Sequence, residues 1–391
     1  MLDVQRVKAL LEAPTPAPLH IRLRNGIQAQ IMDGTLRPGE VLPSERTLQK
    51  QLNVSRATVR QALQSLIQLG LLQSVPGTGT FVLERRANAV TQGIVTLLTG
   101  AQTFHFFYPQ LASALYTTLR AEGYALTLDF YGDEAQNLLA HVQNLLAQQV
   151  SGLAIVPPRY GDVRPLLALL RNEGLPYVFL GRRVTLPDDG GPLGDLGDCV
   201  TTDNERIGYE ATRHLLDLGH RRIVHLGFLD YSTGQDRAAG YARAMQEAGL
   251  LPWVVELLPY SRASGAIIPV AEFLAEPAYR AARDVWGQGR EEGPTAVFCF
   301  NDNAAMGVYK ALRDLGLRIP QDVSIVSVDN LPTIQHFEVP FTTFALPGEA
   351  IGAQAGRILS QRLRGEGFPP QQILLPARFV KRLSTAPPPG M

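Results

Sequence analysis

One stretch near the N-terminus constrains the fold more than any other, because it carries the signals for two short helices and a hairpin in close succession. Ser44 and Ser55 each stand ahead of a helical period, and a serine hydroxyl there accepts hydrogen bonds from the unsatisfied N–H groups of a helix start. Two apolar runs then flank a turn sequence, in the order 71–75, Pro76-Gly77-Thr78-Gly79 and 80–83. This is hairpin chemistry, and the order helix, turn, helix, hairpin predicts a winged helix that docks in the major groove of DNA.

The second of these helices would present two different faces. Its buried face is predicted from a recurrence at helical spacing, with Val59, Ala62, Leu63 and Leu66, and Gly70 would end the helix. Arg56, Arg60 and Gln64 share the opposite face. Arg56 falls in the first turn, where the helix dipole disfavours a cation by about 0.3–1 kcal/mol, a cost that a phosphate would remove. We therefore favour DNA contact over an ordinary solvated face.

Over almost its whole length this stretch resembles the GntR-type winged-helix transcription factors. The segments that match the family pattern in order and spacing are PGEVLPSERTL, VSRATVRQAL, L-x-x-L-G-L-L and GTGTFV. The resemblance implies a domain that binds double-stranded operator DNA. The residues it assigns to this contact are Arg46, Ser55, Arg56, Thr58 and Arg60, together with Gly77 and Thr78 in the wing.

The charges of the chain are unevenly placed. Residues 19–92 hold nine Lys and Arg against four Asp and Glu, a balance of +5, whereas residues 93–391 hold 25 against 30, a balance of −5. The basic part is the part predicted to meet DNA. With 391 residues the chain is too long for one core, so we expect two or three domains.

Nothing in the sequence points to secretion or to a membrane. Cys199 and Cys299 lie too far apart to suggest a disulfide framework, which favours a reduced, cytoplasmic location. The N-terminal residues lack the apolar segment of a signal peptide, and no window approaches the roughly 18 apolar residues of a spanning helix.

The composition shifts along the chain predict five segments. Residues 1–18, which end in alternating prolines, read as an ill-ordered or loosely packed arm. Leu23, Ile27 and Ile31 mark a helix that would complete the winged-helix domain, residues 19–83. The apolar pattern lapses over 84–92, the predicted linker, which leaves an effector domain over 93–385 and a tail over 386–391.

Beyond the linker, short apolar runs alternate with helical periods, which predicts a parallel α/β fold. The expected strands are 94–98, 125–131, 152–156, 177–180, 223–226, 296–300 and 323–328, and helices are expected at 110–120, 138–149, 207–218 and 303–315. Ligands of such sheets bind beyond the carboxyl ends of the strands.

This part resembles the LacI/GalR effector domains, which are built like periplasmic sugar-binding proteins. The matching segments include VTTDNERIGYEATRHLLDLGHRRIVHLG, DRAAGYARAMQEAGL and TAVFCFNDNAAMGVYKALRDLGLRIPQDVSIVSVDN. The resemblance implies two α/β subdomains with a ligand cleft between them. One would comprise residues 93–200 and 330–366, the other 201–329 and 367–385.

Several residues are candidates for contact with an effector. Asp302 follows an apolar strand, and its carboxylate could accept hydrogen bonds from two hydroxyls of a polyol or could instead cap the following helix. The resemblance favours the ligand role for Asp302 and also for Arg237. Arg182 follows the end of another strand and could contact the effector. The alternative is that its side chain is a solvated charge on a loop. The aromatic residues near predicted loops, which could stack on a sugar or belong to the core, are Phe106, Phe107, Tyr131, Tyr231 and Tyr260.

We find no constellation for catalysis, no cofactor motif and no metal site. His214 and His220 lie six residues apart, but no third ligand of suitable spacing accompanies them. The motifs of zinc proteases, P-loops and nucleophile elbows are all missing from the sequence.

The sequence therefore predicts a ligand-responsive transcriptional regulator rather than an enzyme. We expect a homodimeric repressor that binds a palindromic operator and is released by a small sugar, a pentose such as arabinose being favoured by resemblance to the arabinose-responsive repressors. The alternatives are a sugar-binding protein of a transport system and an α/β enzyme that acts on sugars or nucleotides. The missing signal peptide and the basic winged helix count against the first, and the missing catalytic groups against the second.

Overall fold

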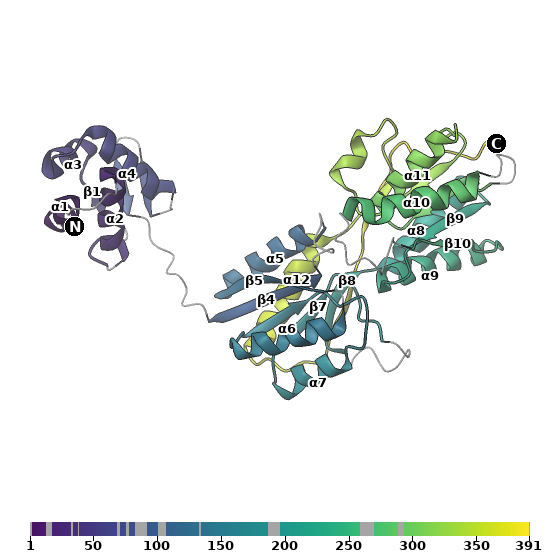
Figure 1. Cartoon of the computed structure of the whole chain (residues 1–391), viewed down its shortest axis with the longest axis horizontal. Coiled ribbons are helices and arrows are strands. Elements are labelled where there is room, and N and C mark those ends of the chain that lie inside the picture. Colours follow the sequence, from purple (N-terminus) through teal and green to yellow (C-terminus); the bar gives the residue numbers. More distant parts are fainter. Residues whose placement is uncertain are drawn as a thin grey trace. The chain divides into compact units, whose positions relative to one another are not determined.

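A computed structural model describes residues 2–12, 18–32, 34–37, 39–68, 71–75, 78–82, 92–100, 107–132, 134–186, 196–258, 270–287 and 293–390. The chain divides into two compact units, Met1–Thr91 and Gln92–Met391, which are coloured along the sequence in Figure 1. Each unit has its own hydrophobic core. No helix in the described part of the chain is long and apolar enough to cross a membrane.

The first unit is a winged helix. Its elements are α1 (Val4–Glu12), α2 (Leu19–Met32), β1 (Val41–Leu42), α3 (Glu45–Leu52), α4 (Arg56–Gln68), β2 (Leu72–Val75) and β3 (Gly79–Val82). Strands β2 and β3 form the predicted antiparallel hairpin, and β1 adds to its β3 side. Both predicted serine caps are confirmed, because the Ser44 hydroxyl accepts from the N–H of Thr47 at 3.2 Å and that of Ser55 from Thr58 at 3.1 Å.

The prediction of a loosely packed arm over residues 1–18 is wrong for its helical part. In α1 the side chains of Val7 and Leu11 are buried in the same core as Leu23 and Ile27 of α2. The side chain of Gln30 also bridges to the backbone of Asp3, accepting from its N–H and donating to its carbonyl, each at 2.8 Å. Helix α1 is therefore an integral part of the winged-helix core.

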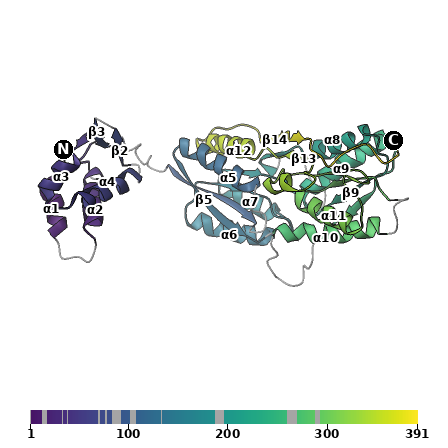
Figure 2. The same ribbon diagram turned by 90° about the horizontal axis from the view of Figure 1, so that it is seen from above.

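The second unit contains two α/β lobes, which Figures 1 and 2 show from two directions. The first lobe consists of β4 (Gly93–Gly100), α5 (Phe107–Ala121), β5 (Tyr124–Tyr131), α6 (Ala135–Ala147), β6 (Gly152–Ile155), α7 (Arg164–Asn172), β7 (Tyr177–Leu180), β8 (Asp198–Thr202), α12 (Gly348–Leu363) and β14 (Gln372–Leu375). Its six strands are all parallel, in the order β14-β8-β7-β6-β4-β5. Apolar side chains of α5 and α12 form one core cluster on this sheet, and those of α6 and α7 form another.

The second lobe repeats this architecture with fewer strands. It consists of α8 (Asn204–Asp217), β9 (Ile223–Gly227), α9 (Ser232–Glu247), β10 (Val254–Glu256), α10 (Val270–Trp286), β11 (Ala296–Cys299), α11 (Asp302–Asp314), β12 (Ser324–Val326), η2 (Pro332–His336), β13 (Thr343–Ala345) and β15 (Arg378–Val380). Four strands form a parallel sheet in the order β10-β9-β11-β12, whereas β13 and β15 pair with each other in antiparallel fashion. Helices α10 and α11 share one core cluster, and α8 and α9 share another.

The predicted α/β fold is confirmed, and each predicted strand of this unit lies on an observed one. The predicted division between the lobes is wrong in two places. Residues 330–366 were assigned to the first lobe, but Leu331, Ile334 and Phe341 pack in the core of α10 and α11 in the second. The assignment of residues 367–385 to the second lobe is wrong in its first half, because β14 pairs with β8 in the sheet of the first lobe.

Strands β8, β10, β13, β14 and β15 were not predicted. All but β8 have only three or four residues, so their apolar alternation is too short to be recognised. Strand β8 is buried throughout, but three of its five residues, Asp198, Thr201 and Thr202, are polar.

Candidate DNA-binding surface and effector cleft

The exposed face of α4 carries two arginines that share one carboxylate. Arg56 and Arg60 lie one helical turn apart, with 66% and 53% of their side chains exposed. Oε2 of Glu45, the first residue of α3, lies 3.2 Å from Nε of Arg56 and 3.4 Å from Nη2 of Arg60. Partial burial raises the pKa of Glu45, but the hydrogen bonds from the two arginines outweigh it and lower the pKa below its usual value. Two cations are thus held together on the face predicted to meet DNA.

The other described residues that were predicted to contact DNA lie in α3, at the start of α4 and directly before β3. Arg46 is exposed in the first turn of α3, and Thr78 is exposed ahead of β3. The hydroxyls of Ser55 and Thr58 bond each other at 2.8 Å at the start of α4, so both also belong to the cap of this helix. Gly77 lies outside the described residues.

In the second unit, Asp302, which was predicted to contact the effector, is fully buried and is held by the chain itself. Its Oδ1 accepts from the hydroxyls of Ser327 and Thr343, the latter at 2.9 Å, and its Oδ2 accepts from the N–H of Leu331 at 2.7 Å. Burial, reinforced by the negative charge of Asp329, raises the pKa of Asp302 to about 7. Asp302 does not cap α11, because the cap is Asn301, whose side chain accepts from the N–H of Ala304 at 2.9 Å.

Arg237 on α9 is buried in the same region. Its Nε donates to Oδ1 of Asn204 at 3.0 Å, and its Nη1 donates to the carbonyl of Phe300 at 2.6 Å. Within the described part of the chain, no acceptor lies within hydrogen-bonding distance of its Nη2. Burial lowers the pKa of Arg237, and the nearby carboxylates of Asp329, Asp236 and Asp302 oppose this effect.

Asp329 is the cleft residue that sequence reasoning missed. It lines a cavity of about 280 Å³ to which both lobes contribute, with Phe107 and Gln110 from α5 and Leu331 and Gln335 from the second lobe. Its φ is +114°, and that of Asn330 is +58°. Burial raises the pKa of Asp329 to about 6, although the charge of Arg237 lowers it. In the sequence, only the polar residues that follow strand β12 indicated that this position could line a cavity.

The backbone at Asp329 is held in its unusual conformation from both sides. Asp302 fixes Ser327 and Leu331, while Nη2 of Arg382 donates to the side chain of Asn330 at 2.6 Å. A positive φ at a residue other than glycine costs of order 1–3 kcal/mol and persists only where the surroundings enforce it. Such strain occurs preferentially at ligand-binding sites.

Arg182 and Tyr231, two further residues that were predicted to contact the effector, contact each other. The guanidinium carbon of Arg182 lies 4.3 Å from the ring centroid of Tyr231, and its Nε donates to the carbonyl of Pro157 at 2.7 Å. The guanidinium of Arg159 lies 5.1 Å from the same ring and 4.5 Å from that of Phe228. Arg182 is buried, so the alternative of a solvated loop charge is wrong.

The predicted aromatic residues do not all reach the cleft. Phe107 lines the cavity beside Asp329. Tyr131 instead lies in the core of the first lobe, where it is 2% exposed and its hydroxyl donates to the carbonyl of Val156, so the prediction of effector contact is wrong for this residue. It ends an edge strand whose last side chain turns inward, which the sequence pattern does not reveal. Phe106 and Tyr260 lie outside the described residues.

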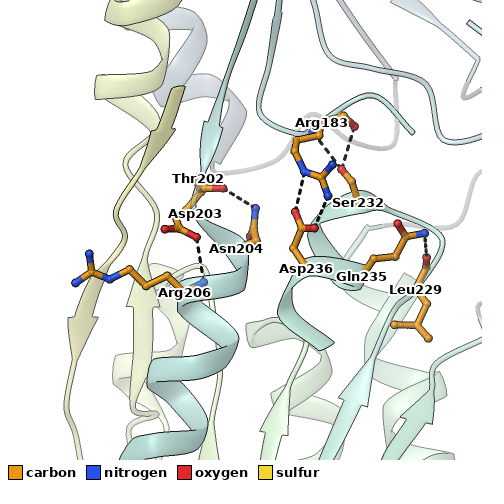
Figure 3. A network of polar contacts seen from close by, with 9 residues as sticks. All are labelled: Arg183, Thr202, Asp203, Asn204, Arg206, Leu229, Ser232, Gln235 and Asp236. Atoms are coloured by element: carbon orange, nitrogen blue, oxygen red, sulfur yellow. Dashed lines mark hydrogen bonds and ion pairs between the residues drawn. The ribbon is translucent and has the colours of Figure 1, made fainter. Parts of the chain in front are cut away.

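Among the described residues, two ion pairs connect the lobes directly. Arg183, which follows β7 in the first lobe, bonds both carboxylate oxygens of Asp236 on α9, as Figure 3 shows. The hydroxyl of Ser232 also accepts from the N–H of Arg183 at 3.1 Å and donates to its carbonyl at 3.0 Å. The second pair joins Arg159 to Asp230. The lobes are thus held together by side chains of opposite charge.

The described residues include no group of three His, Cys, Asp or Glu side chains that could hold a metal ion. His214 bonds Thr385, and His220 bonds Thr295, Ser324 and the carbonyl of Ala386. Both cysteines are free and buried, and burial raises the pKa of the Cys199 thiol to about 12.

Comparison with known proteins identifies both units. The family described as bacterial regulatory proteins, gntR family, matches residues 22–82, and the periplasmic binding protein-like domain matches residues 212–385. The arabinose metabolism transcriptional repressor of Geobacillus stearothermophilus is 31% identical over 356 residues, which cover 88% of this chain and 91% of that protein. The HTH-type transcriptional repressor PurR of Escherichia coli is 31% identical over 301 residues, or 76% of this chain and 80% of that protein.

A solved structure confirms the fold independently. The transcriptional regulator CelR in complex with cellobiose aligns with a TM-score of 0.61 at 23% identity, covering 98% of this chain and all of that one. The fold, the arginine face and the cleft define a transcriptional regulator in which a DNA-reading domain is joined to a ligand-sensing one. The chain belongs to the family of the arabinose metabolism transcriptional repressor, with a GntR-type domain and a periplasmic-binding-protein-like domain.

Proposed function

We propose that this protein is a cytoplasmic transcriptional repressor, without enzymatic activity, that binds a palindromic operator as a homodimer and releases it when a small sugar binds in the cleft. The cleft between the lobes is the observation that supports effector binding. Asp329 is held with a strained backbone at a cavity between two lobes, and the charge of Arg237 acts on its carboxylate. A carboxylate and an arginine fork are the polar groups that hold hydroxyls in an otherwise closed pocket.

The charges of this region favour an uncharged effector. Arg237 lies near the carboxyl groups of Asp329, Asp236 and Asp302, and the two arginines that join the lobes are paired with Asp230 and Asp236. Burying an anionic or cationic ligand would add an uncompensated charge, which costs several kcal/mol. We infer a neutral, hydroxyl-rich ligand, and the relative named for arabinose metabolism makes a pentose the first candidate.

The DNA-reading half rests on the arginines of α4. In a winged helix of this type the second helix of the pair enters the major groove, and a dimer reads two half-sites related by two-fold symmetry. Arg56 and Arg60 are exposed on that helix, and guanidinium groups bind both phosphates and guanine edges. We assign base contact to these two residues and phosphate contact to Arg46, to Ser55 and Thr58, and to the wing at Gly77 and Thr78.

A thermal-shift screen tests the sensing half. Pentoses, hexoses and purines are added to the purified protein at graded concentrations, purines being included because PurR is also a relative. A ligand at a hundred times its dissociation constant stabilises the folded protein by about 2.7 kcal/mol, which is a readily measured shift. We expect a pentose to give the largest shift. A response to purines alone would refute the sugar assignment, and turnover of any ligand would favour the enzyme alternative.

A further inference from the structure

The contact between Glu45 and the two α4 arginines has a consequence for how this domain reads DNA. Glu45 begins α3 directly after the Ser44 cap, and Leu48 and Leu52 anchor the helix in the core, so the backbone position of Glu45 is fixed. Its carboxylate is 32% exposed and meets Arg56 and Arg60 through a single oxygen, Oε2. Both arginines are thereby drawn to one point on the exposed face of the domain.

The remaining hydrogen-bonding groups of the two arginines stay available. Arg56 uses only its Nε and keeps both terminal nitrogens, while Arg60 uses only Nη2. Within the described residues, neither guanidinium has another hydrogen-bond partner. A fork with two free terminal N–H groups matches the O6 and N7 acceptors of guanine, which is the commonest specific contact in the major groove.

Neither folding stability nor affinity for DNA in general explains why an acidic residue, Glu45, lies beside the two arginines. Exposed ion pairs contribute little to stability, and a negative charge beside the DNA-facing arginines weakens their attraction to every phosphate. Two arginines one turn apart also repel each other, and long arginine side chains lose much rotamer freedom when they bind. A carboxylate that orients both in the free protein reduces that loss and favours the geometry of specific contact.

We propose that Glu45 is a positioning residue that orients Arg56 and Arg60 for base reading, so that it raises the discrimination between operator and other DNA while lowering affinity for DNA in general. This inference rests on the proposed DNA-binding function.

The test uses the full-length protein and duplexes with a randomised central region. Wild type, Glu45→Gln, Arg56→Ala and Arg60→Ala each select their preferred sequences, which are then sequenced. The affinity of each protein is titrated for the wild-type consensus duplex and for a scrambled one. Glu40→Gln is the matched control, because it removes the same charge from the same unit and its side chain accepts from the N–H of Arg37, outside α4. Thermal unfolding of every variant shows that the domain is intact.

For Glu45→Gln we expect the ratio of consensus to scrambled affinity to fall at least fivefold, with scrambled-duplex affinity unchanged or higher. The lost preferences should fall at the base pairs whose preference Arg56→Ala or Arg60→Ala also removes, while Glu40→Gln keeps the wild-type ratio. A ratio for Glu45→Gln within twofold of wild type overturns the proposal. So does loss at a base pair that neither arginine variant affects, because Glu45 would then read a base itself. If wild type selects no sequence at all, the DNA-binding function fails and this inference with it.

Discussion

The ion pair between Arg183 and Asp236 should contribute to effector binding without touching the effector. It joins the two lobes through both carboxylate oxygens and is 31% and 20% exposed at its two side chains. Because this ion pair is only partly shielded from water, its contribution to the free energy of the closed form is at most about 1 kcal/mol. Because closing the lobes encloses the ligand, a bridge that favours the closed form raises the apparent affinity by the same free energy.

Asp236→Asn keeps the shape of this side chain and removes its charge. We expect the dissociation constant of the effector, measured by titration calorimetry, to rise by about twofold to fivefold, which corresponds to roughly 0.5–1 kcal/mol. The increase should appear mainly in the dissociation rate, because the bridge acts on the closed form. At high salt the difference between wild type and variant should shrink as the charges are screened.

A matched control separates this effect from a general loss of charge. Asp217 forms an exposed ion pair with Arg213 on α8 of the same lobe, and Asp217→Asn should leave effector affinity unchanged. An unaltered dissociation constant for Asp236→Asn would show that the bridge does not favour the ligand-bound form. A loss of more than about a hundredfold would show instead that Asp236 contacts the ligand.

Three further predictions concern the two sites and their titration. Arg56→Ala and Arg60→Ala should each cost about 1–3 kcal/mol of operator binding and relax the sequence preference, while calorimetry finds effector binding intact; unchanged operator affinity in both would refute the DNA-contact assignment. Arg237→Ala and Asp302→Ala should weaken effector binding at least tenfold, since losing a partner of a charged buried hydrogen bond costs about 1.5–3 kcal/mol, and wild-type affinity would place the pocket elsewhere. Because burial raises the pKa of Asp302 to about 7, its contribution to stability is present at low pH and is lost as the pH rises through that value. The free energy of unfolding of the second unit should thus decrease between pH 5 and pH 8, and Asp302→Asn should flatten this dependence in denaturant titrations; an equally steep dependence in the variant would assign it to other groups.

Local signals explain most of what the sequence predicted correctly. The Ser44 and Ser55 caps and the hairpin depend on residues within a few positions of one another, so the pattern alone identifies them. The apolar buried strands of the parallel sheets were recognised for the same reason, whereas β8, with three polar residues, was not. Helix α1 was missed because its few apolar side chains, such as Val7, precede alternating prolines and are buried against α2 and α3, which no local pattern records.

The cleft was only partly predictable because it depends on tertiary geometry. Arg237 was predicted from its sequence segment to contact the effector, and in the structure it is buried beside Asn204 and Phe300. Asp329 was missed because its position in the cavity depends on a backbone with φ of +114°, and its residue type does not predict such a conformation. Tyr131 was misassigned because an aromatic residue at a strand end looks the same in sequence whether its ring faces a cleft or a core.

The central claim is that the ligand-sensing unit controls the DNA-reading unit. The most direct test is to measure effector affinity by titration calorimetry, with and without a saturating amount of the duplex that the protein itself selects. Thermodynamic reciprocity requires operator DNA to weaken effector binding by the same factor by which effector weakens operator binding, and couplings of about 1–3 kcal/mol are typical. We predict a dissociation constant that rises about fivefold to 150-fold when DNA is bound. Equal constants in the presence and absence of DNA would show that the two units are uncoupled and would contradict the regulatory account.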